Sequence, residues 1–180
     1  MVERLAGLPL IAQPGKAWNY SVATDVLGYL VEVISGQPFE VYLKEKVIRP
    51  LGMVDTDFHV PAVKHDRLAA NYSAGPGGKL DLTDDPAKSR YLAPRTVNSG
   101  GGGLVSTASD YLRFCRFMLN KGELDGARIL SPAAVELMYT NVVPMDVLKN
   151  FQGTQGFNEH VGFGMDFRIV MNPRAIGRMD

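Results

Sequence analysis

The sequence predicts an α+β fold in which helices outnumber strands. Four segments show the apolar period of amphipathic helices, and one segment near the C-terminus shows the period of two that is typical of a strand. With 180 residues, 46% of them hydrophobic, the chain is long enough for one ordinary domain or part of one. A single strand cannot pair its own backbone, so we expect the fold to be incomplete within these residues.

Two closely spaced helices are expected early in the chain. Residues 23–34 carry a continuous apolar face, and Gly36 is suited to end the helix that they form. A second helix should start at Pro38, which fits a first helical position, and stop before Pro50. The charged residues at positions 44–46 are interpreted as the solvated face of this second helix.

A long connection separates these helices from the next one. Residues 51–98 contain several Pro and Gly residues and no sustained period, which is typical of a connection with short elements. The run from Gly100 to Gly103 either lines a substrate cleft or marks a tight backbone crossing that only glycine fits. A helix should follow the candidate caps Ser106 and Thr107 and end at Gly122.

Two further elements are expected towards the end of the chain. Ser131 is a candidate cap followed by a first-turn proline, so residues 132–139 should form a short helix. Beyond it, apolar residues alternate with Gly164, Asp166 and Arg168, which predicts one half-buried strand. The alternating apolar residues are Phe163, Met165, Phe167 and Ile169.

Composition argues against several classes of function. Nineteen basic and nineteen acidic residues balance, so nucleic acid is not an expected partner, and no apolar run approaches the roughly 20 residues of a membrane span. His59, His65 and His160 are isolated from one another and from the single Cys115, and no phosphate-binding glycine motif is present. We therefore expect no metal and no cofactor. A cytoplasmic and an exported location both stay open.

Four ordered blocks resemble serine beta-lactamase-like hydrolases and their penicillin-binding-protein relatives, the group related to class C beta-lactamases. The blocks are 14–22 (PGKAWNYSV), 49–56 (RPLGMVDT), 101–111 (GGGLVSTASDY) and 162–165 (GFGM). The resemblance covers nearly the whole chain. It implies a partial beta-lactamase/transpeptidase-like fold, in which residues 1–180 hold most of the helical domain and the start of an antiparallel sheet.

The resemblance also implies a catalytic role for Tyr20. In this family the serine of a Ser-x-x-Lys motif attacks an ester or amide carbonyl, and a tyrosine at the position of Tyr20 shuttles the proton. An ordinary tyrosine ionises only near pH 10, so the role requires neighbouring cations, which are lysines in the family. The alternative is an aromatic residue that only packs. Candidate substrate-binding residues are Trp18, Ser21, Val22, Gly101 and Gly102.

Val22 indicates a particular branch of the family. It stands where true beta-lactamases have asparagine, as in esterases and acyltransferases of the same fold, and residues 65–72 (HDRLAANY) also resemble the esterase branch. The resemblance therefore implies a small ester or amide substrate and an acyl-serine intermediate. A beta-lactamase and a D-alanyl-D-alanine carboxypeptidase are the alternatives within the enzyme class.

The nucleophile motif is absent from the sequence. No serine is followed three positions later by lysine, and the final family motif, which completes the oxyanion hole, would be expected after the strand near Gly162. We therefore expect residues 1–180 to be an internal part of one catalytic domain, inactive alone, with the Ser-x-x-Lys region before it and sheet strands after it. A non-catalytic relative or binding module is the alternative from another class.

Overall fold

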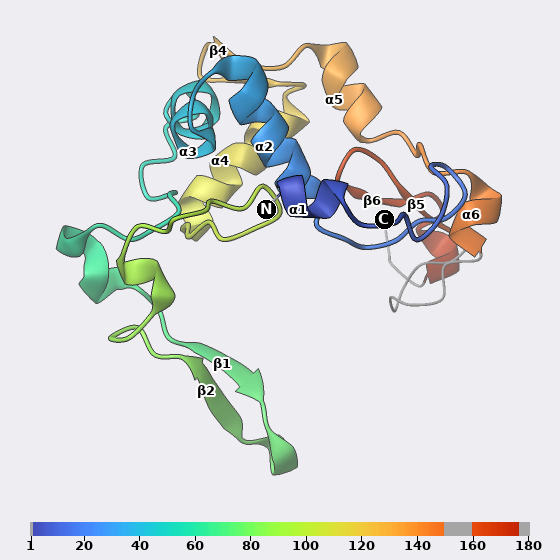
Figure 1. The fold of residues 1–180 in the computed structure, drawn as a ribbon. Coiled ribbons are helices and arrows are strands. Elements are labelled where there is room, and N and C mark those ends of the chain that lie inside the picture. Colours follow the sequence, from blue (N-terminus) through green and yellow to red (C-terminus); the bar gives the residue numbers. More distant parts are fainter. Residues whose placement is uncertain (1, 150–159, 177–180) are drawn as a thin grey trace. The chain divides into compact units, whose positions relative to one another are not determined.

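The computed structural model describes residues 2–149 and 160–176 (Figure 1). Within these residues, helices alternate with three two-stranded antiparallel sheets, which confirms the predicted α+β class. The chain divides into two compact units: Met1–Ala23 together with Cys115–Asp180, and Thr24–Phe114. We call these the first and the second unit. In the part of the chain that the structure describes, none of the helices combines the length and the apolar character needed to cross a membrane.

Helices α2 (Ala23–Ser35) and α3 (Phe39–Leu43) confirm the two helices predicted early in the chain. Gly36 follows α2 with a φ of 69°, a left-handed conformation that glycine adopts without strain. α3 continues directly into the π-helical segment η1 (Lys44–Ile48), in which hydrogen bonds span five residues. The backbone N–H of Arg49, for example, donates to the Lys44 carbonyl at 2.9 Å.

The connection after η1 contains short elements, as predicted. They are η2 (Ala62–Arg67), β1 (Asn71–Ala74), η3 (Pro76–Gly78), β2 (Leu80–Asp84) and η4 (Arg90–Leu92). Strands β1 and β2 pair in an antiparallel hairpin that projects from the rest of the second unit (Figure 1). Because the hairpin is almost entirely exposed, burial does not hold it in place, which explains why no strong apolar period marks it in the sequence.

The core of the second unit is formed by the end of η1 and the first part of this connection. Its buried apolar side chains are Ile48, Leu51, Met53 and Phe58. Asp57 and Val105 exchange two backbone hydrogen bonds, of 3.1 and 2.9 Å, so residues far apart in the sequence lie side by side. This pairing places the segment before α4 (Ala108–Leu119) against the buried residues.

Helix α4 begins where the sequence predicts. Thr107 caps it, since the Thr107 hydroxyl accepts a hydrogen bond of 3.2 Å from the backbone N–H of Asp110. Ser106, the other candidate cap, instead shares a hydrogen bond of 2.7 Å with the Thr56 hydroxyl. Gly122 follows the helix with a φ of 87°, and its N–H donates to the carbonyl of Phe117.

The first unit has its own core and elements. The elements are α1 (Val2–Ala6), β3 (Glu123–Leu124), β4 (Ala127–Arg128), α5 (Pro132–Met138), α6 (Met145–Lys149), β5 (Val161–Phe163), β6 (Arg168–Val170) and η5 (Arg174–Ile176). Its buried apolar residues are Phe117, Met118, Leu124, Val135, Val147, Leu148 and Val161. α5 confirms the helix predicted after Ser131.

The single strand predicted near the C-terminus is wrong. Residues 161–170 form a hairpin, in which Val161 pairs with Val170 and Phe163 with Arg168. The chain turns back at Asp166, whose φ of 64° is a left-handed conformation that aspartate tolerates better than most residues. The period of two runs through both strands, so the pattern did not reveal the turn. Within the described residues, the two strands pair with each other.

Removing the cap of α5 should weaken the first unit. The Ser131 hydroxyl accepts a hydrogen bond of 3.1 Å from the backbone N–H of Ala134, so Ser131→Ala should lower the free energy of unfolding by about 1 kcal/mol. Ser131→Asp keeps an acceptor and is the control. Urea unfolding followed by circular dichroism measures both variants, and equal losses in the two would show that the cap contributes nothing.

Candidate functional site

Tyr20 lies in the extended segment that leads into α2. The residue is 83% exposed within the described structure, so a small molecule can reach it. The ring of Trp18 lies 6.3 Å from that of Tyr20, and Trp18 also makes an edge-to-face contact with Phe163 of β5, at 5.2 Å between centroids. The structure therefore brings two of the sequence-predicted residues, Trp18 and Tyr20, together on a support supplied by β5.

Asn141 holds that support in place. Its side-chain oxygen accepts hydrogen bonds from the backbone N–H groups of Phe163, at 3.0 Å, and Val143, at 3.3 Å, and its amide donates to the Val143 carbonyl. Gly162 packs so closely on Asn141 that a methyl group there would approach it to 2.6 Å. Trp18 thus rests on a strand whose position is determined by side-chain hydrogen bonds as well as by pairing. Asn141 was not among the residues predicted from the sequence.

Two other predicted residues, Ser21 and Val22, lie at the start of α2. The Ser21 hydroxyl accepts a hydrogen bond of 3.2 Å from the backbone N–H of Ala23, an arrangement typical of a helix start. Val22 is 45% exposed beside it. Both residues follow Tyr20 directly, so they share its extended segment, and the exposed side chain of Val22 is available for contact with a ligand.

The glycines at 100–102 belong to the second unit and differ from one another. A methyl group on Gly100 would overlap the carbonyl oxygen of Thr24 and approach the backbone nitrogen of Gly28 to 3.0 Å. At Gly101 it would meet the Thr24 hydroxyl at 2.5 Å, whereas Gly102 has no atom within 4 Å of that position. The tight-crossing interpretation therefore accounts for Gly100, where the nearest atoms are backbone. At Gly101 the nearest atoms belong to side chains, and Gly102 borders open space.

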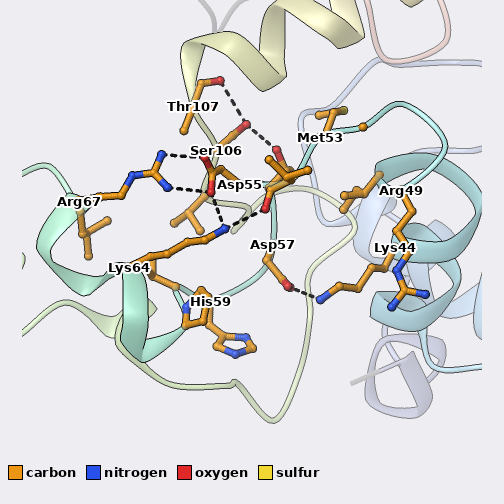
Figure 2. A pocket seen from close by; sticks show the side chains of 18 of the residues that line it. Lys44, Arg49, Met53, Asp55, Asp57, His59, Lys64, Arg67, Ser106 and Thr107 are labelled. Atoms are coloured by element: carbon orange, nitrogen blue, oxygen red, sulfur yellow. Dashed lines mark hydrogen bonds and ion pairs between the residues drawn. The ribbon is translucent and has the colours of Figure 1, made fainter. Parts of the chain in front are cut away.

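A pocket of about 640 Å³ opens in the second unit (Figure 2). Its polar side carries Lys44, Arg49, Asp55, Asp57, Lys64 and Arg67. The apolar side includes Ile48, Met53, Val60, Pro61, Leu68 and Val105. These residues come from η1, from the segment after it, from η2 and from the segment before α4. The Asp57–Val105 pairing brings the segment after η1 and the segment before α4 together.

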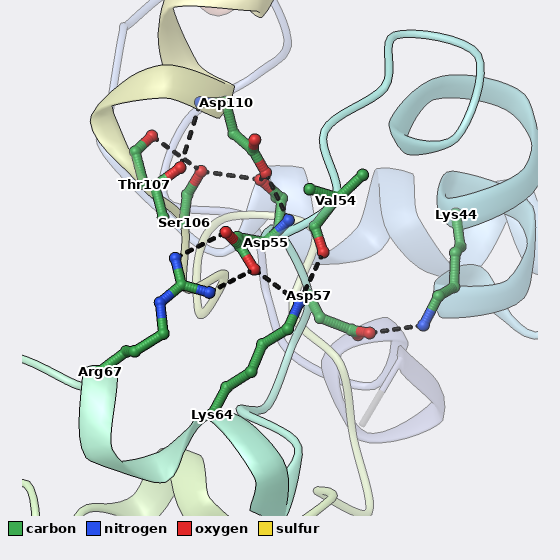
Figure 3. A network of polar contacts seen from close by, with 10 residues as sticks. Lys44, Val54, Asp55, Asp57, Lys64, Arg67, Ser106, Thr107 and Asp110 are labelled. Atoms are coloured by element: carbon green, nitrogen blue, oxygen red, sulfur yellow. Dashed lines mark hydrogen bonds and ion pairs between the residues drawn. The ribbon is translucent and has the colours of Figure 1, made fainter.

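Asp55 is the centre of the polar network in this pocket (Figure 3). Its carboxylate accepts a hydrogen bond of 2.5 Å from Lys64 and two, of 2.9 and 2.7 Å, from the guanidinium of Arg67. These hydrogen bonds, first from Arg67 and then from Lys64, hold the pKa of Asp55 far below its ordinary value of 3.8. The backbone N–H of Asp55 donates to the buried carboxylate of Asp110, which ties the network to α4.

Most of this network was not predicted from the sequence. Lys44 was assigned to a solvated helix face, but its ammonium forms an ion pair of 2.5 Å with Asp57 and lines the pocket. A signal did exist: Asp55 and Arg67 fall within the blocks 49–56 and 65–72 that carry the family resemblance. Their contact could not be inferred, because the connection between them has no regular period.

Acid should destabilise the protein through Asp55. Because the pKa of Asp55 is lowered by folding, its ion pairs stabilise the folded state fully above pH about 4, and this stabilisation is lost as the pH falls towards the folded pKa. Asp55→Asn should therefore unfold at lower urea than wild type at pH 7, with a difference that shrinks below pH about 4. The exposed Asp81→Asn is the control. A difference that did not change with pH would contradict the assignment.

The chain is similar to one protein family along almost its whole length. The family model described as Beta-lactamase matches residues 1–174. An uncharacterized protein of Mycobacterium tuberculosis is 39% identical over 171 residues, which cover 94% of this chain and 42% of that protein. Esterase EstB of Burkholderia gladioli is 35% identical over 126 residues, covering 62% of this chain and 32% of EstB.

Solved structures give the same result. EstCE1, described as a hydrolase with promiscuous acyltransferase activity, matches with a TM-score of 0.77 and 28% identity, over 96% of this chain and 46% of EstCE1. The chain thus spans less than half the length of EstCE1 and of the proteins that it matches in sequence.

Proposed function

Because the chain belongs to the Beta-lactamase family, we propose that it forms part of a serine hydrolase that cleaves small esters or transfers acyl groups through an acyl-serine intermediate. The beta-lactamase/transpeptidase-like fold implied by the sequence is confirmed by the family match and by the similarity to EstCE1. The named relatives include an esterase and a hydrolase with acyltransferase activity, which supports ester rather than beta-lactam chemistry.

The observation that carries the proposal is the exposed Tyr20 beside Trp18. Tyr20 occupies the family position of the proton-shuttling tyrosine, and the residue is 83% exposed, next to Trp18, which packs on Phe163. A hydroxyl that moves a proton to and from a substrate must be reachable by that substrate. Tyr20 meets this requirement within the described residues, and its catalytic role is supported by its position in the family motif.

We assign substrate contacts to the residues around Tyr20 and to the exposed glycine. Trp18 and Val22 would offer apolar surface to the acyl or alcohol group of the ester, and Ser21 a hydroxyl. Gly101 and Gly102 of the second unit are proposed as further substrate contacts through their backbone, with Gly102 favoured because its position is open. Val22, where beta-lactamases have asparagine, supports an ester as the substrate.

Residues 1–180 are further proposed to be one part of a single catalytic domain. The family nucleophile motif, Ser-x-x-Lys, does not occur among them, and the chain spans less than half of its relatives. Exposed apolar side chains on α2 also support this proposal, since a helix that is apolar on most sides is normally covered. They include Leu27, Leu30, Val33 and Ile34. The isolated chain should therefore lack esterase activity.

A chimaera tests the catalytic role of Tyr20. Residues 1–174 would replace the matching segment of EstCE1, which would supply the nucleophile, and hydrolysis of a short p-nitrophenyl ester would be measured. Tyr20→Phe should lower kcat by about 100-fold or more, because it removes the proton-transferring hydroxyl. Tyr29→Phe, which removes the hydroxyl of another exposed tyrosine, is the control and should leave kcat unchanged.

Two results would contradict parts of this proposal. Full activity of the chimaera with Tyr20→Phe would remove the catalytic role of Tyr20. Ester turnover by the isolated 180-residue chain, lost in Tyr20→Phe, would show that the nucleophile lies within these residues after all. Hydrolysis of a chromogenic beta-lactam in preference to the ester would favour the beta-lactamase alternative, and an inactive but ester-binding chimaera would favour a non-catalytic binding module.

A further inference from the structure

We propose that the pocket lined by η1, η2 and the segment before α4 binds a small organic anion, a carboxylate that carries an alkyl or arylalkyl chain. All the lining residues lie between Lys44 and Thr107, within the second unit, so the proposal does not depend on Tyr20 or on ester hydrolysis. The volume, about 640 Å³, falls within the roughly 300–1,000 Å³ that is common for small-molecule sites.

The carboxylates of the pocket are already occupied. One oxygen of Asp57 accepts from Lys44 at 2.5 Å, and the other accepts from the backbone N–H of Phe58 at 2.8 Å. Both oxygens of Asp55 accept from the side chains of η2, as described above. A cationic ligand would therefore have to displace an existing ion pair, which disfavours an amine.

Hydrogen-bond donors, in contrast, remain available. No hydrogen bond or ion pair joins the side chain of Arg49 to any residue that the structure describes, and a guanidinium has five N–H donors. Lys44 uses one of its three N–H donors on Asp57, and its side chain is 44% exposed. Figure 2 shows Lys44 and Arg49 coming from the same helical stretch. A carboxylate can accept charge-assisted hydrogen bonds from both.

Charge favours the Lys44 and Arg49 end of the pocket over the opposite end. Four cations and two carboxylates line the pocket, an excess of two positive charges. Near Arg67, however, the carboxylates of Asp66 and of the buried Asp110 make the electrostatic potential less positive, which disfavours an anion there. We therefore assign the anionic group of the ligand to Lys44 and Arg49.

The apolar side of the pocket determines the rest of the ligand. Ile48 and Met53 are buried, and Val60, Leu68 and Val105 are half-buried around the same space. A simple inorganic anion would leave this surface in contact with water, whereas a carboxylate with an apolar chain would cover it. The site thus combines a few placed polar groups with an apolar wall, the usual composition of a small-molecule pocket.

Calorimetric titration of the 180-residue chain with 4-phenylbutyrate tests the proposal. We expect saturable binding with a Kd of about 1 mM or lower. The neutral 4-phenylbutanamide and the cationic 4-phenylbutylamine have the same apolar body and should bind at least about tenfold more weakly, because they lose the charge-assisted bonds. Equal affinity for the amide, or no saturable binding of 4-phenylbutyrate, would overturn the proposal.

Two variants locate the bound anion. Arg49→Gln removes an exposed charge that has no partner in the described structure, and should weaken 4-phenylbutyrate binding about tenfold. Lys88→Gln removes an exposed charge of the same unit outside the pocket lining and should leave binding unchanged. Ala69→Phe, at an exposed lining position, should weaken binding by filling the pocket. Unchanged affinity in both Arg49→Gln and Ala69→Phe would place the ligand elsewhere and refute the site.

Discussion

Gly100→Ala should lower the free energy of unfolding by about 3 kcal/mol. The added methyl group would overlap the carbonyl oxygen of Thr24 and approach the backbone nitrogen of Gly28 to 3.0 Å. Backbone atoms cannot move to another rotamer as a side chain can, so either α2 or the glycine segment must shift. Because whole domains are stable by only about 5–15 kcal/mol, a loss of this size should move the urea midpoint clearly.

Gly102→Ala is the matched control. It lies two positions away in the same glycine run, but nothing stands within 4 Å of an added methyl group. Its free energy of unfolding should stay within about 0.5 kcal/mol of wild type, as for most exposed substitutions. If both variants lost the same stability, the close crossing of α2 would not be the reason for glycine at position 100.

Leu51→Ala should cost a similar amount, about 3 kcal/mol, for a different reason. The Leu51 side chain has no exposed surface, and it lies in the core of the second unit with Ile48 and Phe58. Truncation would remove apolar burial and leave a cavity, and the backbone of residue 51 cannot easily shift to close that cavity, because it is held from two sides. The Leu51 carbonyl accepts a hydrogen bond from Arg113 of α4, and its N–H donates to Val47.

Val54→Ala serves as the control for Leu51→Ala. Val54 lies three positions further along the same segment, and its side chain is 77% exposed. It should lose less than about 0.5 kcal/mol in the same urea titration. A small effect of Leu51→Ala, comparable to that of Val54→Ala, would show that the core of the second unit relaxes to fill the space.

The role of the glycine run at 100–103 could not be decided from the sequence. A cleft loop and a backbone crossing both require glycine, so residue type could not separate the two interpretations. The close approach of Gly100 to Thr24 decides for a crossing at that position. Gly102 borders open space, so a substrate contact stays available at that position.

The pocket around Asp55 could not be predicted from the sequence, because its residues lie far apart along the chain. Its residues are spread from Lys44 to Thr107, and tertiary contacts such as the pairing of Asp57 with Val105 and the Thr56–Ser106 hydrogen bond bring distant parts of that range together. The helical pattern predicts that a charged residue such as Lys44 faces solvent. The pattern contains no information about which other segments pack near that face. The hairpin at 161–170 was not predicted, because the turn at Asp166 does not interrupt the alternation of apolar and polar residues.

The sequence by itself determined the family, the α+β class and the positions of α2, α4 and α5. Helical periods and caps such as Thr107 and Ser131 act over a few residues, so a linear pattern contains them. Motif order likewise led to the prediction that Tyr20 is the proton-shuttling residue, which stays a prediction. Only the tertiary structure decided which distant residues meet: Trp18 with Phe163, Gly100 with Thr24, and Lys44 with Asp57. Such contacts depend on how the connections pack, and no periodic pattern in the sequence encodes that packing.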